Sequence, residues 1–455
     1  MASLTRAGSD LHRLTATEAA ARIRSGELSP VDLVDACLSQ IKAREPAVKA
    51  WVCVEAEEAL RVARERADEA QVGRFRGPMH GIPVALKDIY HVKGLVTTAG
   101  ADPFFHQRPE SDAASVARLR AAGAVVLGKT TTTEFANMDP TETRNPWNPE
   151  HTPGGSSSGS AAAVGASMAP FALGSQTVGS TLRPAAYCGI VGFKATHGRV
   201  STAGVVALAW SFDTVGILCR SVADIALGVD VLSGYDAQDP ASVDMPPPDC
   251  RAALSAAAAP PRLGIPRRFV ETAQPETIEH VYAVADRCRR AGASIQDVEL
   301  PPSFVGVQAA GRVVVGAEAA TFHADNFPAR AQLYREKFRG TLADGAKTGA
   351  VDYVRALRQC RLFRREIEAL MPPFDALLMP TAPAPAPRGL ASTGDPVFCA
   401  PWSCAGVPAI ALPSGVAADG LPLSVQLVAA PWNEAELLRT ARWVEALLDW
   451  RSEPR

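Results

Sequence analysis

The chain has 455 residues, with 46 lysines and arginines against 48 aspartates and glutamates, so its formal net charge is −2. Hydrophobic residues make up 47% of the sequence and charged residues 21%, proportions typical of globular proteins, which excludes a wholly disordered chain. The sequence contains no run of lysine and arginine, and a nucleic-acid surface needs clustered positive charge. We therefore expect a large buried core and no nucleic-acid partner.

The sequence also lacks the marks of targeting, membrane insertion and metal binding. The first thirty residues contain no apolar signal-peptide core, and no stretch of about 18 apolar residues occurs. The nine cysteines are scattered without a CxxC pair, and the eight histidines form no HExxH motif. We expect a cytoplasmic protein with reduced thiols, no membrane-spanning segment and no metal site.

Helix and strand patterns alternate along the chain. Thr15 and Glu18 form a capping box, and Ser29 precedes Pro30 as the N-cap of a second helix. Such alternation is typical of α/β proteins. We expect one α/β domain over residues 1–455, with a central twisted sheet that is mixed but mostly parallel and is covered by helices on both faces. The other predicted helices span 56–70, 113–122, 221–232, 351–370 and 434–448; the predicted strands are one ending at Lys87, 124–127, 377–379, 409–412 and 423–428, with a strand–helix–strand unit over 262–300.

Two short motifs match known patterns without the context that those patterns need. Residues 123–130 fit the phosphate-loop pattern GxxxxGK[ST], but the intervening Ala-Val-Val-Leu is typical of a buried strand. Residues 155–159 fit the nucleophile elbow GxSxG, which requires a central strand directly before it, whereas prolines precede it here. We keep an α/β-hydrolase only as a weaker alternative.

The most unusual segment contains no charge at all. Between His151 and Leu182 there is no aspartate, glutamate, lysine or arginine. The apolar runs 161–164 and 168–173 indicate burial, which a flexible linker does not need. We therefore expect a folded interior lined by hydroxyl groups, contributed by Ser156, Ser157, Ser158, Ser160, Ser167, Ser175 and Ser180.

A lysine precedes this segment at the end of a predicted buried strand. A serine hydroxyl is a weak nucleophile and needs a base, and Lys87 is a base only if burial among uncharged groups favours its neutral form. The backbone amides of residues 174–180 can offer an oxyanion hole. The residues alone leave two interpretations open: an acyl-transfer site, or an ordinary Lys87 ion pair beside turn-forming serines.

Several separated motifs decide between these interpretations. Lys87 and Ser156 are 69 residues apart, and Ser156 and Ser180 are 24 apart. By these spacings and motifs the chain resembles the amidase signature family, with a family core over about 60–225 and 370–450. Residues 235–350 lie outside the resemblance, and we expect them to help build and cover the substrate pocket. The matching motifs are 81–83 with 87–88, 153–163, 174–185, 188–194, 378–381, 405–410, 420–422 and 426–427.

The resemblance implies a set of catalytic roles. Ser180 would be the acylated nucleophile, Ser156 a bridging serine that follows a cis peptide bond, and Lys87 the terminal base. Water would complete deacylation, so no cofactor is implied. The oxyanion hole would be formed by the backbone amides of Thr177, Val178 and Gly179.

The sequence departs from the family pattern near the nucleophile. Many members have an acidic residue where this chain has Gln176, a glycine where it has Val178, and an arginine two residues after the nucleophile, whereas Arg183 follows by three. The missing carboxylate would make neutral Lys87 easier to maintain. Arg183 would either meet the substrate or hold the loop. Met138, Gln176 and Arg183 are the candidate substrate-binding residues.

These observations predict a serine hydrolase that cleaves carbon–nitrogen bonds of linear amides through an acyl-enzyme. We expect a small, neutral substrate and water as its partners, and leave open activity on esters, anilides and carbamates (urethanes) as well as a homodimer. The first alternative is the amidase subunit of a glutamine-dependent tRNA amidotransferase. That alternative predicts loss of activity without partner subunits.

Overall fold

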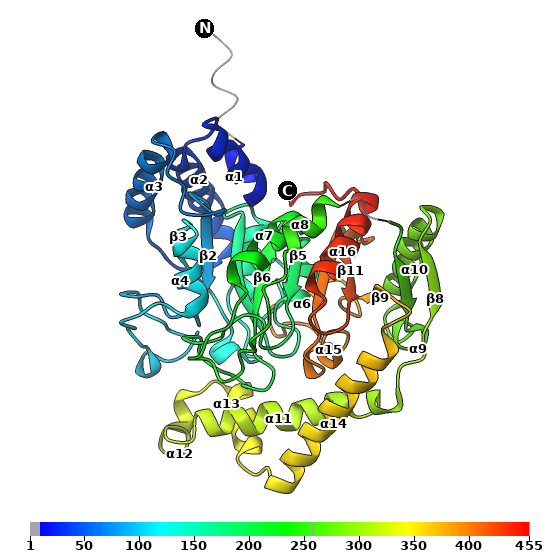
Figure 1. Cartoon of the computed structure of the whole chain (residues 1–455). Helices are drawn as coiled ribbons and strands as arrows, with labels where there is room; N and C mark the ends of the chain where they lie inside the picture. Colours follow the sequence, from blue (N-terminus) through cyan, green and yellow to red (C-terminus); the bar gives the residue numbers. More distant parts are fainter. Residues whose placement is uncertain (1–9, 257–258, 455) are drawn as a thin grey trace.

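The computed structural model describes residues 10–256 and 259–454, and its strands join one sheet (Figure 1). The order across this eleven-stranded sheet is β1-β3-β2-β4-β6-β5-β10-β11-β9-β7-β8. Strands from both ends of the chain therefore share one layer, and β7 and β8, from the middle of the chain, extend its edge. The strands are β1 (Trp51–Val54), β2 (Pro83–Lys87), β3 (Val125–Thr130), β4 (Phe171–Gln176), β5 (Val191–Lys194), β6 (Thr214–Cys219), β7 (Arg262–Ile265), β8 (Ser294–Asp297), β9 (Ala376–Pro380), β10 (Ala409–Val416) and β11 (Pro422–Val428).

The sheet is mixed, as expected, but it is not mostly parallel. Six neighbouring pairs are antiparallel and four are parallel. The parallel pairs join β2 to β3 and β4, and β7 to β8 and β9. The short connection 417–421 forces β10 and β11 to be antiparallel, because only a crossover returns the chain in the same direction. β6 lies antiparallel between β4 and β5, and no helix separates β5 from β6 in the described chain.

Helices flank the sheet, and the two predicted caps are present. Thr15 and Glu18 form a capping box, and the Ser29 hydroxyl accepts a hydrogen bond from the Val31 N–H. The helices are α1 (Ala16–Ser25), α2 (Pro30–Val48), α3 (Ala56–Gln71), α4 (Ala114–Ala121), α5 (Ser158–Gly165), α6 (Leu182–Cys188), α7 (Val222–Leu232), α8 (Cys250–Ser255), α9 (Arg267–Val270), α10 (Pro275–Arg290), α11 (Val307–Phe322), α12 (Phe327–Arg330), α13 (Glu336–Gly345), α14 (Ala350–Leu370), α15 (Ala400–Cys404) and α16 (Glu434–Leu448).

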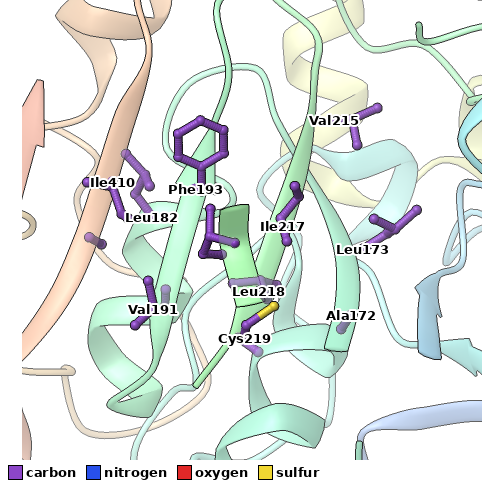
Figure 2. Packing of buried hydrophobic residues seen from close by; sticks show 14 of the residues in the cluster. Ala172, Leu173, Leu182, Val191, Phe193, Val215, Ile217, Leu218, Cys219 and Ile410 are labelled. Atoms are coloured by element: carbon purple, nitrogen blue, oxygen red, sulfur yellow. The ribbon is translucent and has the colours of Figure 1, made fainter. Parts of the chain in front are cut away.

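The centre of the core lies around β4, β5 and β6. Figure 2 shows Leu173, Phe193 and Ile217 of these strands gathered with Leu182 of α6 and Ile410 of β10, and all five are buried. Burying each such side chain contributes about 1.5–3 kcal/mol. The two segments that contain the candidate serines, α5 and the turn between β4 and α6, are therefore anchored to the core of the fold.

Helix α5 lies in the protein interior along its whole length. Its close approach to the β1–β3 region requires glycine at position 159, because a Cβ atom there would lie 2.2 Å from the Ala50 carbonyl oxygen and 2.4 Å from the Thr131 nitrogen. The charge-free segment is therefore a buried helix and strand, as its apolar runs predict.

Helices α11, α13 and α14 form a separate group on the side of the molecule away from α1 and α3 (Figure 1). α14 packs against α11, and its residues Ala356, Cys360 and Phe363 are buried. Within the described ranges, no helix has the length and apolar character needed to cross a membrane.

Candidate active site

Lys87, the last residue of β2, is fully buried beside two serines. Its Nζ atom lies 2.7 Å from Ser156 Oγ and 2.7 Å from Ser175 Oγ. Burial lowers the pKa of Lys87 to about 7, and the Asp213 carboxylate opposes this shift only in part. A large fraction of the amine is therefore neutral near pH 7, and its lone pair can accept a proton from a hydroxyl group.

A second buried lysine on the neighbouring strand has its own anion. Lys129 of β3 lies 2.7 Å from the Asp88 carboxylate, and its ammonium also donates to the Tyr90 carbonyl. Among the described residues, Lys87 has no carboxylate within 4.0 Å. The interpretation of Lys87 as an ordinary ion pair therefore does not fit the structure. The lysine of the GxxxxGK[ST] match lies in strand β3, as expected.

Ser156 lies two residues before α5, and the peptide bond between Gly155 and Ser156 is cis. The Ser156 carbonyl accepts a hydrogen bond of 3.3 Å from the Thr133 N–H. The next residue, Ser157, joins this turn to β4, since its hydroxyl contacts both the N–H (3.1 Å) and the carbonyl (3.2 Å) of Ser175. Ser157 is thus held by the backbone. The GxSxG alternative requires a strand directly before this serine, and the described chain has none there.

Ser180 lies in the turn between β4 and α6 and is 8% exposed. Its carbonyl accepts a hydrogen bond of 3.2 Å from the Ser157 N–H, which places this turn against the Ser156 turn. In the part of the chain that the structure describes, no hydrogen bond joins the Ser156 and Ser180 side chains. Of the two side-chain contacts that the expected relay needs, the structure therefore shows the one between Lys87 and Ser156.

The backbone before Ser180 offers free donors. Among the described residues, the N–H groups of Val178, Gly179 and Ser180 make no hydrogen bond to protein, whereas the Val178 carbonyl accepts from Ser403 and the Gly179 carbonyl from the Arg183 N–H. The carbonyl groups are thus held in place while consecutive N–H groups remain available. Such a run of amides can bind an oxyanion.

Gln176, a candidate substrate-binding residue, has its side chain committed to the protein. Its Oε1 atom accepts hydrogen bonds of 3.0 Å from the N–H groups of both Thr181 and Leu182, and its Nε2 atom donates to Ser403 Oγ at 3.0 Å. Gln176 is the fully buried last residue of β4, and its side chain reaches the start of α6. Gln176 therefore holds the turn that contains Ser180.

Arg183, in the first turn of α6, also has its side chain committed to the protein. Its guanidinium donates to the Gly155 carbonyl at 2.6 Å, to the Gly394 carbonyl at 2.7 Å and to Thr393 Oγ1 at 3.1 Å. Of the two roles expected for Arg183, these contacts match the loop-holding one. Met138 is 53% exposed, and no hydrogen bond within the described ranges joins it to Lys87 or the serines.

Asp213 belongs to this site although sequence reasoning missed it. Its carboxylate accepts hydrogen bonds from Thr177 Oγ1 at 2.5 Å and from the N–H groups of Leu208 (2.8 Å) and Ala209 (3.0 Å). Burial raises the pKa of Asp213 to about 6, and these hydrogen bonds oppose the rise. The carboxylate thereby fixes Thr177, the first residue of the turn between β4 and α6. A single aspartate before a strand gives no sequence signal for such a role.

Two serines were also missed as partners. Ser175 shares the Lys87 ammonium with Ser156, and Ser403, from a segment more than 200 residues away, contacts both Gln176 and Val178. Ser175 also lines a small pocket together with Tyr90, Thr177 and Asp213, among other residues. The contact between Ser175 and Lys87 follows from the pairing of β4 with β2, which the sequence alone does not indicate.

Comparisons with known proteins agree with this geometry. A family model described as Amidase matches residues 32–438. The chain is similar to the A-subunit of the glutamyl-tRNA(Gln) amidotransferase of Chloroflexus aurantiacus, with 37% identity over 480 residues and 98% of both chains covered. The corresponding protein of Geobacter metallireducens is 36% identical over 482 residues, covering 98% of this chain and 99% of the relative.

Solved structures extend the likeness to the whole fold. The native peptide amidase of Stenotrophomonas maltophilia is 32% identical, with a TM-score of 0.83, and the match covers 97% of this chain and 98% of that one. A vestigial protein complex, described as revealing the origins of an s-triazine catabolic enzyme, contains a chain that is 32% identical, with a TM-score of 0.89 and coverage of 96% and 98%.

The relatives overturn the main functional expectation. The chain was expected to be a stand-alone hydrolase of small amides, yet the curated relatives named above are subunits of an amidotransferase, over almost their full length. The departure from the family pattern at Gln176 does not argue against an amidotransferase subunit, because the Gln176 side chain is occupied by protein contacts.

Proposed function

The chain belongs to the amidase family, whose members act on carbon–nitrogen bonds, and on that premise we propose that it is the amide-hydrolysing subunit of a glutamine-dependent tRNA amidotransferase. The observation that carries the proposal is the match to these amidotransferase relatives along 98% of the chain. The arrangement of Lys87, Ser156 and the turn before Ser180 supports it, because release of ammonia from a carboxamide requires a base, a nucleophile and an oxyanion hole.

In the proposed acylation step, the Ser180 hydroxyl oxygen attacks the side-chain carboxamide carbon of glutamine. The proton of Ser180 passes to Ser156 while the proton of Ser156 passes to the neutral Lys87 amine. The carboxamide oxygen becomes an oxyanion, for which the amides of Val178 and Gly179, together with that of Thr177, are the proposed donors. The existing 2.7 Å contact between Lys87 Nζ and Ser156 Oγ supports this step, because the two groups are already within hydrogen-bond distance.

Collapse of the tetrahedral intermediate breaks the carbon–nitrogen bond. The proton held by Lys87 returns through Ser156 to the leaving nitrogen, so ammonia departs and Ser180 keeps a glutamyl ester. Water then attacks the ester carbon, and the same relay takes the water's proton and returns one to the Ser180 oxygen. The products are glutamate and the ammonia that an amidotransferase transfers.

Ammonia release from glutamine tests the proposal. The chain is assayed alone and together with the companion subunits of the source organism's glutamyl-tRNA(Gln) amidotransferase. We expect ammonia release in the complex, little release from the chain alone, and none from a complex that contains Ser180→Ala. Equal turnover of glutamine with and without the companion subunits would contradict a role within such a complex.

A substrate panel completes this test. The isolated chain is offered chromogenic amides, esters and carbamates alongside glutamine. The proposal predicts that the assembled complex prefers glutamine over every member of the panel. Faster turnover of a panel member by the isolated chain than of glutamine by the complex would refute it.

A further inference from the structure

The outward face of α14 combines exposed aliphatic and basic side chains. We define the α14 stripe as Val351, Val354, Arg358, Arg361, Leu362 and Arg365. Its three aliphatic members are 62%, 53% and 43% exposed in chain order, and its three arginines are exposed as well. Spacings of three, four and seven residues place all six on one side of a helix. The three arginines are not consecutive in the sequence. They come to lie on one side of the molecule because α14 is helical.

The arginines of the α14 stripe have no anionic partner among the described residues. Two other arginines of this helix are paired within it, Arg355 with Asp352 at 3.9 Å and Arg364 with Glu368 at 3.0 Å. In the described part of the chain, no carboxylate lies within 4.0 Å of the stripe's own arginines. The stripe therefore presents uncompensated positive charge next to apolar side chains.

The mixture of arginine and aliphatic side chains in the α14 stripe favours a protein as its binding partner. Arginine and apolar side chains together are typical of protein–protein interfaces, while binding to a nucleic-acid backbone needs no aliphatic groups. A second copy of this chain is a poor fit, because a twofold contact through the stripe would bring like charges together. The complementary surface is an apolar strip bordered by aspartate and glutamate.

We propose that the α14 stripe is the docking surface for a companion protein subunit whose contact face is apolar at its centre and acidic at its edge. This inference rests on the proposed function, because that function requires companion subunits. The inference goes beyond the proposed function because it names the surface that binds the partner and the chemistry of the partner's contact face.

Hydrogen bonds link α14 to the neighbourhood of the candidate active site. The Tyr353 hydroxyl donates to Glu318 Oε1 of α11 at 2.7 Å. Glu318 in turn accepts hydrogen bonds from the Ser211 N–H at 2.9 Å and from Ser211 Oγ at 2.5 Å. Ser211 lies two residues before Asp213, whose carboxylate holds Thr177. A partner bound to the stripe would therefore contact a helix that is linked, through Glu318 and Ser211, to the segment containing Asp213.

A charge-reversal triple tests the inference. The variant Arg358→Glu/Arg361→Glu/Arg365→Glu is compared with the wild-type chain for binding to the immobilised companion subunits of the source organism's amidotransferase. Because like charges would then face one another, we expect the Kd to rise by about 100-fold. Wild-type binding is also expected to weaken as salt is added.

The chain offers a matched control. Arg22, Arg64 and Arg74 are exposed, have no anionic partner among the described residues, and belong to the α1–α3 region, on the opposite side of the molecule from α14 (Figure 1). The triple Arg22→Glu/Arg64→Glu/Arg74→Glu makes the same change in net charge, and its Kd should stay within about twofold of the wild-type value. Labelling of Ser180 by a fluorophosphonate shows that each variant is folded.

Five results would overturn the inference. Equal losses of affinity in the two triples would show that net charge alone matters. Unchanged binding in the α14 triple would place the partner elsewhere while the proposed function stands. A wild-type dimer dissociated by the α14 triple, or a loss of tRNA binding from a complex that still assembles, would identify a different occupant. If the wild-type chain binds none of the companion subunits, both this inference and the proposed function fail.

Discussion

Lys129 Nζ lies 2.7 Å from the Asp88 carboxylate, deep in the sheet and one strand away from Lys87. Asp88, the residue that follows Lys87 in the sequence, is thus paired with Lys129 and not with Lys87. Lys87 is left among hydroxyl groups, with Ser156 and Ser175 each 2.7 Å from its amine. Two buried lysines on adjacent strands thus have different environments, and only the one without a carboxylate is suited to act as a base.

Breaking the Lys129–Asp88 pair is expected to destabilise the fold. Asp88→Asn leaves the Lys129 ammonium buried without an anion, which costs about 3–5 kcal/mol of unfolding free energy. The double variant Asp88→Asn/Lys129→Met removes the charge and should recover most of this loss. Urea denaturation measures all three proteins. A single variant as stable as the wild type would show that the pair has no structural role.

The pH dependence of turnover is expected to follow the Lys87 amine. Burial lowers the pKa of Lys87 to about 7, and the proposed mechanism needs the neutral form. Glutamine hydrolysis by the complex should therefore rise as the pH rises through about 7 and level off above it, with roughly a tenfold loss for each pH unit below. A rate that is flat from pH 5 to 9, or that falls across neutrality, would rule out Lys87 as the base; Lys87→Ala is the inactive control.

Gln176 gives a sharper test of the same environment. Gln176→Glu keeps an acceptor for the Thr181 and Leu182 N–H groups, so the turn should stay in place. The added anion favours the ammonium form of Lys87, so the pH–rate profile should shift upward. Gln176→Leu removes the acceptor and should lower kcat without such a shift. If Gln176→Glu leaves the profile unmoved, Gln176 acts only by holding the turn.

Arg183 is expected to act through position rather than through substrate contact. Its guanidinium spans the Gly155 and Gly394 carbonyls, a geometry that a lysine cannot reproduce. Arg183→Lys and Arg183→Met should both lower kcat, while the KM for glutamine changes by less than about threefold. Steady-state kinetics separates the two parameters. A large rise in KM with unchanged kcat would instead point to substrate binding by Arg183.

Much of the site follows from local sequence patterns. The apolar run that ends at Lys87 predicts a buried lysine, and the absence of charge over 151–182 predicts an interior that suits a neutral amine; the lysine and most of the segment are buried in the structure. The capping box and the N-cap likewise depend on neighbouring residues alone. Patterns of this kind need no knowledge of the tertiary fold.

The rest depends on contacts between distant segments. Ser403 reaches Gln176 across more than 200 residues, and Asp213 meets Thr177 only because β6 pairs with β4. The predominance of parallel strands was mispredicted for the same reason, since strand pairing is set by tertiary topology rather than by periodicity. The mistaken functional expectation arose similarly: the active-site motifs describe the chemistry, whereas membership of a complex depends on surfaces, such as the one proposed on α14, that no motif marks.

Covalent labelling tests the central claim most directly. The chain is treated with a fluorophosphonate, which captures an activated serine, and the modified residue is located by peptide mass spectrometry. The proposed relay predicts a single adduct on Ser180, its loss in Ser180→Ala, and strongly reduced labelling in Lys87→Ala. An adduct on Ser157, or none in the wild-type chain, would contradict the account.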